Sequence, residues 1–444
     1  MNKLSLNYTS NAKSISSFSG LKIYDDLISK FDIKKFFGPF LPKKKRDSGH
    51  PSWDKFYTLI MGFIAGFDCL DDFDFHGEDP LFLKLTNSPS STTLGKFLRF
   101  FTLRNIEKIQ AELPLHALKI RISLTPKIDR MTLTMDASEH KQYGLKTEGV
   151  KYNYKKFLAL SSQMIFDDKG LCYGFKLREG GTHSVVDGPE MLYRALSVIP
   201  KDVKKLFRAD SAYSSMEMYN TCLNQNCPFI ICLKENTWSS ILKNNHGHLT
   251  WKKTKLQFFD SKNCETTSAL YYPKGLAGGK EYLRVVFIRT KNLTPKKGAK
   301  HTYHYYSVVT DISESEMNND KILKNYRKRS QVENNIKDLK NGMDFHHFPT
   351  MKLKANNVWG LAGIIAYNLM RFTSFQIAGE GGCFVETTRK KIILIAGEII
   401  THARSIEIRL MNYIYKEVCR IKAMINFVST TDANRWGPQE GHQT

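Results

Sequence analysis

The segment from Tyr326 to Lys340 contains the side chains best suited to chemistry in this sequence. On a helix, five of them fall at offsets 0, 3, 7, 11 and 14 and share one narrow stripe. They are Tyr326, Arg329, Glu333, Lys337 and Lys340. A neighbouring apolar stripe would pack this helix down, and it consists of Val332, Ile336, Leu339 and Met343. A solvated face with ion pairs such as Glu333–Lys337 would explain the Glu and the Lys, but not the Tyr and the Arg beside them.

Two aspartates elsewhere in the chain lie at the expected ends of strands. Near residue 130, Met131, Leu133 and Met135 alternate with polar residues, which predicts a strand with Asp136 at its polar end. A later strand is expected to deliver Asp210 at its end. The strands expected after the first cover 157–166, 171–178 and 205–209, with a helix over 188–198. This order predicts an α/β domain whose first and last strands both end in Asp.

Three carboxylates of this kind suit phosphodiester chemistry. Transfer of a phosphodiester requires charge to be neutralised on the attacking and the leaving oxygen, and two divalent ions about 3.5–4 Å apart do this. Hard cations prefer oxygen ligands, so Asp136, Asp210 and Glu333 could hold Mg²⁺ if the two strands are neighbours and the helix packs over them. Lys and Arg beside Glu333, with Arg208 two residues before Asp210, would then contact DNA phosphates.

The charge balance agrees with a polyanionic partner. The 444 residues carry a net charge of +23. Of this, +6 lies in residues 1–130 and +17 in the remainder. Nucleic acid is the expected partner, with a generically basic surface as the alternative. The N-terminus has no apolar core of the length a signal peptide needs, and no apolar run is long enough to cross a membrane, so we expect a cytoplasmic protein without a membrane partner.

The rest of the chain divides by pattern. Residues 20–125 are expected to be mostly helical. Within them, the acidic patch from Asp71 to Asp79 could be a metal site or a solvated loop. A capped basic helix from Ser91, with Lys96, Arg99 and Arg104, could read DNA in a helix-turn-helix or belong to a plain bundle. Residues 226–311 alternate short β patterns with Gly and Lys clusters and are expected to form an antiparallel insertion, after which helices resume.

Together these segments resemble the bacterial insertion-sequence transposases of the DDE superfamily. The resemblance is to the branch marked by a Tyr-x2-Arg-x3-Glu-x6-Lys signature, which Tyr326, Arg329, Glu333 and Lys340 match. The flanking segments agree, from Leu133-Thr-Met-Asp136 through Gly181-Thr-His-Ser184 and Phe207-Arg-Ala-Asp-Ser-Ala-Tyr213 to Ala366-Tyr-Asn-Leu369. The similarity runs from about residue 20 to about residue 425.

The resemblance implies a ribonuclease-H-like catalytic core interrupted by a β-rich insertion, with helical regions at both ends. It implies that Asp136, Asp210 and Glu333 bind two Mg²⁺ ions, for which Mn²⁺ can substitute. It also implies that Tyr326, Arg329 and Lys340 grip the DNA end. The implied partners are element ends and target DNA, bound by a homodimeric synaptic complex at the nucleoid. The expected regions are 1–125 for DNA binding, 126–225 and 312–372 for the core, 226–311 for the insertion and 373–444 for the C-terminal helices.

Some features leave alternatives open. The second-Asp motif of the family often has an aromatic residue where this chain has Ser215, while the aromatic residue here is Tyr213. Trp238 and Trp251 could stack on an unpaired base or simply pack in the insertion. His183 is expected to make a structural hydrogen bond. A hydrolytic nuclease of the same fold and a DNA-binding regulator with a decayed active site are the competing functions.

Overall fold

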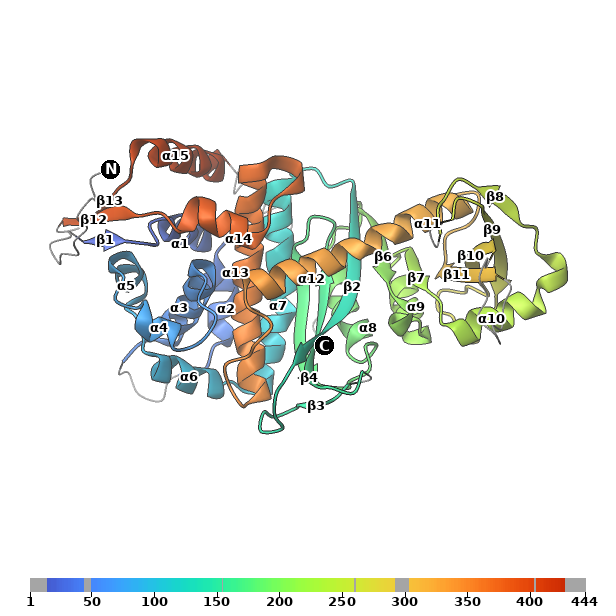
Figure 1. Ribbon diagram of the computed structural model, residues 1–444, viewed down its shortest axis with the longest axis horizontal. Helices are drawn as coiled ribbons and strands as arrows, with labels where there is room; N and C mark the ends of the chain where they lie inside the picture. The colour runs from blue at the N-terminus through green and yellow to red at the C-terminus, as the bar shows by residue number, and fades with distance from the viewer. Residues whose placement is uncertain are drawn as a thin grey trace, which may run out of the picture. The chain divides into compact units, whose positions relative to one another are not determined.

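The computed structural model describes residues 14–43, 49–153, 155–258, 261–291, 303–402 and 405–427, which form a mixed α/β structure (Figure 1). The contacts divide the chain into two compact units. One unit joins the described residues up to Glu112 with Lys146–Glu148 and those from Asp338 onward. The other contains Leu113–Leu145 and the described residues between Gly149 and Lys337. The three carboxylates of interest all belong to the second unit.

Six strands and three short helices form the first part of the second unit. The strands are β2 (Arg130–Lys141), β3 (Lys151–Tyr152), β4 (Leu158–Phe166), β5 (Cys172–Glu179), β6 (Lys204–Ala209) and β7 (Phe229–Cys232). The helices are α8 (Gly188–Ser197), the 3-10 turn η2 (Ser211–Tyr213) and α9 (Met216–Asn224). The main strand order is β5-β4-β2-β6-β7. The pairs around β4 are antiparallel, whereas β2, β6 and β7 run parallel. The α/β arrangement expected for this segment is therefore confirmed.

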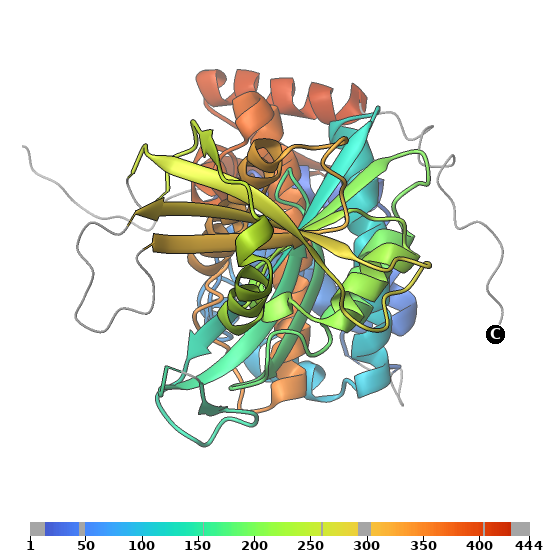
Figure 2. The same ribbon diagram turned by 90° about the vertical axis from the view of Figure 1, so that its right-hand side faces the viewer.

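The segment after β7 continues the same sheet. It contains α10 (Glu235–Asn244), η3 (His246–His248), β8 (Lys252–Thr254), β9 (Cys264–Tyr271), β10 (Leu283–Lys291) and β11 (Tyr303–Thr310). Strand β11 pairs antiparallel with β7 and with β10, and β10 pairs with β9 (Figure 2). The expected antiparallel strands are present, but they are joined to β6 edge to edge through β7. The helix α10 was not expected; it forms where Trp238 and Ile241, three residues apart, can both be buried.

Two helices in series carry the Tyr326–Lys340 segment, which the sequence placed on one helix. Helix α11 (Asn319–Arg327) ends in the 3-10 turn η4 (Lys328–Ser330), and α12 (Gln331–Gly342) follows (Figure 1). The expected stripe is thus interrupted between Tyr326 and Glu333. The apolar stripe of α12 is confirmed, because Val332, Ile336, Leu339 and Met343 are all buried.

The other unit is mainly helical. Its helices are α1 (Leu21–Lys30), α2 (Ile33–Phe37), η1 (Gly38–Phe40), α3 (Ser52–Ala65), α4 (Asp72–Phe75), α5 (Pro80–Thr86), α6 (Ser91–Arg99), the first part of α7 (Leu103–Leu124), α13 (Leu353–Ala378), η5 (Gly379–Gly381), α14 (Val385–Thr388), the π-helical turn η6 (Arg389–Ile393) and α15 (Asn412–Phe427). A small sheet of β1 (Ile15–Ser16), β12 (Gly397–His402) and β13 (Ser405–Arg409) completes it, and its hairpin was not expected in a region read as helical.

Helix α13 is the core of this unit. It is buried at every position from Ala355 to Ser374, as expected for a helix that is apolar on all sides. Phe63 of α3 packs on Trp359 with ring centroids 4.6 Å apart, and the Tyr24 hydroxyl hydrogen-bonds the Thr373 hydroxyl at 2.6 Å. The N-terminal helices therefore share one core with a helix from the second half of the chain. None of the helices in the described ranges is long and apolar enough to cross a membrane.

The acidic patch is largely explained by helix ends. The Asp79 carboxylate caps α5 by accepting from the amides of Leu81 and Phe82. The Asp74 carboxylate accepts from the amide of Ser91 at the start of α6. Asp68, Cys69 and Asp72 lie within one cluster, where the Asp72 carboxylate accepts the amides of the other two. These contacts favour the structural interpretation of the patch over a metal site.

Candidate active site

The register of the sheet brings Asp136 and Asp210 together. In the parallel pair of β2 and β6, Thr134 lies opposite Arg208. Asp136 follows Thr134 by two residues on β2, and Asp210 follows Arg208 by two residues, directly after the end of β6, so the two side chains leave the sheet at neighbouring positions on the same face. The expected adjacency of the two strands is confirmed.

Asp136 does not lie at the end of its strand, however. Strand β2 continues to Lys141 because its second half stays paired with β4, where Asp136 lies opposite Met164. Strand β6 does end at Ala209, directly before Asp210. Beyond the two aspartates, β2 is therefore no longer paired with β6 along that edge.

Local hydrogen bonds orient both carboxylates. The Ala137 amide donates to Oδ1 of Asp136 at 2.9 Å. The Ala212 amide donates to Oδ1 of Asp210 at 2.9 Å, so Asp210 caps the turn η2. Each aspartate is thus oriented by an amide of the backbone that follows it.

Arg329 joins Glu333 to this pair. Its Nη1 donates to Oδ2 of Asp136 at 3.2 Å, and its Nη2 donates to Oε1 of Glu333 at 2.9 Å. The side chain of Arg329 is only 17% exposed, whereas that of Glu333 is 59% exposed. The 3-10 turn η4 places Arg329 between the sheet and the first turn of α12. One guanidinium therefore bridges a half-buried aspartate and an exposed glutamate.

The charges in this cluster do not balance. Burial raises the pKa of Asp136 from 3.8 to about 6, and the charge of Asp210 adds to this effect, while Arg329 opposes it. For Arg329, burial alone would lower the pKa, but Tyr326 and the three carboxylates together raise it above its ordinary value. Three carboxylates around one guanidinium form a site with excess negative charge and oxygen donors only, which is the donor set that hard divalent cations prefer.

The other residues expected at the site occupy different environments. Tyr326 is buried, and its ring lies 5.8 Å from that of Tyr306. Arg208 is 5% exposed, and it donates to the main-chain oxygen of Asn325 at 2.8 Å. Lys337 is exposed on the part of α12 that belongs to the second unit. Lys340 is half-buried and lies on the part of α12 assigned to the other unit.

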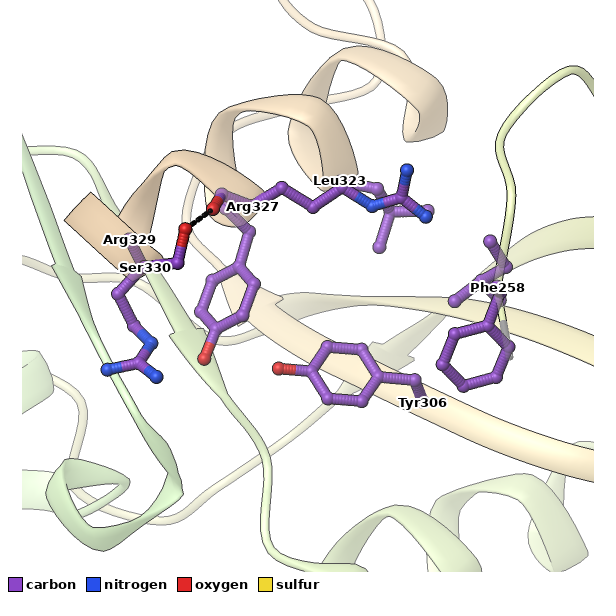
Figure 3. Close-up of a pocket in the computed structure, with 8 residues that line it drawn as sticks. Phe258, Tyr306, Leu323, Arg327, Arg329 and Ser330 are labelled. Atoms are coloured by element: carbon purple, nitrogen blue, oxygen red, sulfur yellow. Dashed lines mark hydrogen bonds between the residues drawn. The ribbon is translucent and has the colours of Figure 1, made fainter. Parts of the chain in front are cut away.

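A cavity of about 200 Å³ lies beside Arg329. The walls come from the insertion sheet and from the α11–η4 segment, and they consist of Phe258, Ile288, Tyr306, Leu323, Tyr326, Arg327, Arg329 and Ser330. Figure 3 shows Arg327 extended along the rim toward Phe258, with Arg329 turned to the opposite side. Arg327 is held there by a hydrogen bond to the main-chain oxygen of Gln257. The cavity thus combines aromatic walls with two guanidinium groups.

The two tryptophans of the insertion are engaged elsewhere. Trp238 is 8% exposed and packs against Tyr305 with ring centroids 5.6 Å apart. The guanidinium of Arg289 lies 3.9 Å from the ring centroid of Trp251. Tyr305 precedes Tyr306 on β11, so the two tyrosines point to opposite faces of the sheet. The aromatic side chains beside Arg329 are therefore Phe258, Tyr306 and Tyr326, not the two tryptophans considered for stacking on a base.

Tyr213 is the last residue of the turn η2, which Asp210 caps, and the sequence did not predict its burial. It is fully buried, and its hydroxyl has no hydrogen-bond partner among the residues that the structure describes. Burial raises the pKa of this hydroxyl well above its ordinary value, and the charges of Asp136 and Asp210 add to the effect. Ser215, where an aromatic residue was expected, caps α9 instead by accepting from the Met218 amide. The only sequence signal was this displaced aromatic residue. His183 accepts a structural hydrogen bond from the Val185 amide, as expected.

Comparison with known proteins assigns the chain to a family. A family model described as transposase DDE domain group 1 matches residues 2–426, which is nearly the whole chain. A comparison with curated proteins found no match.

Proposed function

Because this chain belongs to the family described as transposase DDE domain group 1, we propose that it binds the ends of a mobile DNA element and catalyses metal-dependent strand cleavage and strand transfer. The observation that carries this proposal is the meeting of Asp136, Asp210 and Glu333 around Arg329, in a chain with a net charge of +23. The family supports the class of chemistry, and the arrangement of the three carboxylates supports the choice of residues.

We further propose that β2, β4, β5, β6 and β7 with their helices are a ribonuclease-H-like core. Three strands in antiparallel succession, followed by two parallel strands reached through helices, support this. In such a core the acidic residues gather where the central strand and its parallel neighbour lie side by side. Asp136 and Asp210 occupy that position, and α12 supplies Glu333 from outside the sheet.

Divalent ions fit this arrangement. Asp136, Asp210 and Glu333 would hold them, because their donors are oxygens and only Arg329 offsets their charge within the cluster. Two Mg²⁺ ions, or Mn²⁺ in their place, would when bound neutralise the attacking and the leaving oxygens of the phosphodiester. With such ions bound, Arg329 would no longer be needed to neutralise Asp136, and it would be available to contact a DNA phosphate.

The cationic and aromatic residues around the triad supply the DNA contacts. Lys337 is exposed one turn beyond Glu333, so it is placed to contact a phosphate near the scissile bond. Lys340 lies further along the same helix and would continue that contact. Arg208 is buried and hydrogen-bonded to the α11 backbone, which favours positioning α11 over contacting DNA.

The cavity beside Arg329 suits a single unpaired base. An apolar cavity of about 150 Å³ can hold a benzene ring, so the cavity of about 200 Å³ can hold a six-membered heterocycle. Aromatic walls stack on any base, and guanidinium groups at the rim hold its phosphate. This role replaces the one considered for Trp238 and Trp251, which are packed within the insertion.

A two-substrate assay tests the function. Purified protein is incubated with Mg²⁺, a labelled duplex that carries an element end, and an unlabelled target plasmid. We expect both a cleaved end and a joined product, and we expect Asp136→Ala, Asp210→Ala and Glu333→Ala to lose both products while keeping end binding. Cleavage without joining would favour the hydrolytic nuclease. Binding of DNA without Mn²⁺ binding or cleavage would favour the decayed regulator. A homodimer in the complex with DNA ends would be visible in the same reaction by its mass.

A further inference from the structure

The guanidinium of Arg329 fills the place between Asp136 and Glu333. Its Nη1 lies 3.2 Å from Oδ2 of Asp136, and its Nη2 lies 2.9 Å from Oε1 of Glu333. Among the described residues, neither carboxylate forms an ion pair with any other side chain. Oδ1 of Asp136 already accepts from the Ala137 amide, so Oδ2 is the oxygen more open to a cation, and Arg329 holds it.

A divalent cation and this guanidinium would compete for the same carboxylates. The side chains of Arg329 and Asp136 are only 17% and 16% exposed, so water screens the repulsion between two cations there poorly. The contact with Glu333 is easier to break, because the Glu333 side chain is 59% exposed and exposed ion pairs contribute little. Occupancy of the cluster by a divalent cation therefore favours release of Arg329.

A second place for the released guanidinium lies beside the first. Arg329 also lines the cavity of about 200 Å³, together with Tyr306, Tyr326 and Arg327. Figure 3 shows the Arg329 side chain turned away from this cavity rim, whereas Arg327 follows the rim. Because Arg329 already borders the cavity, a change of its side-chain rotamer takes the guanidinium from the carboxylates to the rim. Its turn η4 joins α11 to α12, and a 3-10 turn within a helical segment often marks a hinge.

We propose that Arg329 is a switch that couples metal binding to DNA binding: it occupies the carboxylates in the metal-free chain and leaves them for a phosphate of the DNA end when a divalent cation is bound. The proposal rests on the metal-dependent function proposed above and adds the regulation of that site. Each ligand favours the other, since both draw on the same displacement of one guanidinium. The coupling is reciprocal, so metal and DNA raise each other's affinity by the same factor.

Three full-length variants separate this competition from a general loss of positive charge. Arg329→Gln removes the charge. Arg329→Lys keeps a charge but cannot donate to both carboxylates at once, and it provides the same comparison if the uncharged variant does not fold. Arg327→Gln is the matched control, because Arg327 lies on the same cavity rim but donates to the main-chain oxygen of Gln257 instead of a carboxylate.

Two binding measurements are made at pH 8 and constant ionic strength. The DNA is an end duplex that already terminates at the cleavage site, so that no cleavage interferes. Electron paramagnetic resonance gives the Mn²⁺ concentration at half-saturation with and without this duplex, with the duplex alone as the blank. Fluorescence anisotropy gives the affinity for the duplex in EDTA and in Mn²⁺.

Without DNA, Arg329→Gln should reach half-saturation at about tenfold less Mn²⁺ than the wild type, with Arg329→Lys between the two. Mn²⁺ should raise the affinity of the wild type for the duplex about tenfold more than it raises that of Arg329→Gln. Arg327→Gln should bind the duplex more weakly in EDTA and in Mn²⁺ alike, with the Mn²⁺ midpoint and the coupling of the wild type.

Three results would overturn the proposal. Mn²⁺ binding to Arg329→Gln or Arg329→Lys that is no tighter than in the wild type would mean that Arg329 does not compete with the metal. Equal coupling in the wild type and the Arg329 variants, or an equal loss in Arg327→Gln, would mean that the metal acts on DNA through overall charge. In both cases, wild-type binding of Mn²⁺ and of DNA ends would still support the proposed function. A wild-type protein that binds no Mn²⁺ would overturn the proposed function and this inference together.

Discussion

Replacing Asp136 by asparagine should stabilise the metal-free protein at neutral pH and abolish strand cleavage. The pKa of Asp136 is raised from 3.8 to about 6, chiefly by burial and then by Asp210. Between these two values the unfolded chain releases a proton that the folded chain keeps, so rising pH favours unfolding. Asparagine has nearly the same shape and carries no charge, so it escapes this penalty.

The magnitude follows from the same two pKa values. The difference between 3.8 and about 6 corresponds to about 3 kcal/mol at roughly 1.4 kcal/mol per pH unit. This difference already includes the attraction of Arg329, which by itself lowers the pKa of Asp136. A gain of about 3 kcal/mol raises the Tm by about 6–12 °C for a unit of this size.

The assay is denaturation of both proteins in EDTA from pH 4 to pH 8. Near pH 4 the two should differ least in stability, because Asp136 is then protonated in the folded wild type and only about half ionised in the unfolded chain. The advantage of Asp136→Asn should grow from pH 4 to pH 6 and stay constant above it. Adding Mn²⁺ at pH 7.5 should raise the Tm of the wild type and leave that of the variant unchanged.

The reasoning would be refuted by a variant that is less stable than the wild type at pH 7.5 in EDTA. It would also be refuted by a difference between the two proteins that does not change with pH. Either result would mean that Arg329 compensates the Asp136 charge fully, so that the site carries no electrostatic strain for an ion to relieve.

Three further perturbations address the DNA contacts. Arg329→Ala and Lys337→Ala should each reduce the steepness of log affinity against log salt concentration for end DNA by about one unit. The control Lys204→Ala, exposed at the opposite end of β6, should leave this slope unchanged. Equal slopes in all three variants would mean that Arg329 and Lys337 do not contact DNA phosphates. Tyr306→Ala should slow cleavage of a fully paired end more than that of an end with an unpaired base at the cleavage site, measured by single-turnover kinetics, and Tyr305→Ala, on the other face of β11, should not discriminate between these substrates. In competition binding with random DNA, the double variant Lys96→Ala/Arg99→Ala should lose preference for the protein's own ends, while Lys84→Ala in the same unit should retain it; retained preference in the double variant would exclude α6 as the reading helix.

The sequence was most informative where local pattern and chemistry coincide. Alternation predicted a strand that carries Asp136, the order of strands and helix predicted that it neighbours the strand before Asp210, and a helical stripe placed Glu333 beside Arg329. Even there, the strand was predicted to end at Asp136, whereas β2 continues to Lys141. This continuation depends on pairing with β4, and no local sequence pattern reveals the register of that pairing. The turn η4 was also hidden, since Lys328 to Ser330 fit a helix as well as a 3-10 turn.

Features that depend on partners distant in sequence could not be predicted. The hairpin of β12 and β13 forms beside β1, nearly four hundred residues away in the chain, in a stretch whose composition also suits a helix. The burial of Tyr213 and the packing of Trp238 on Tyr305 are results of tertiary contacts, so residue type alone singled out the wrong aromatic side chains. The shared core of α3 and α13 likewise joins regions that the sequence separated.

The edge-to-edge joining of β6, β7 and β11 determines how this active site can move. A domain inserted through two flexible linkers could swing as a lid, but here a continuous ladder of backbone hydrogen bonds runs from the strand that precedes Asp210 to the strand that carries Tyr306. Hinge rotation would have to break that ladder at β7, which pairs on both of its edges. The acidic cluster and the aromatic cavity are therefore carried by one continuous sheet, which can change its twist but cannot bend at a hinge between them. Any large deformation needed to bring a DNA strand into contact with both the acidic cluster and the aromatic cavity must therefore occur in the DNA.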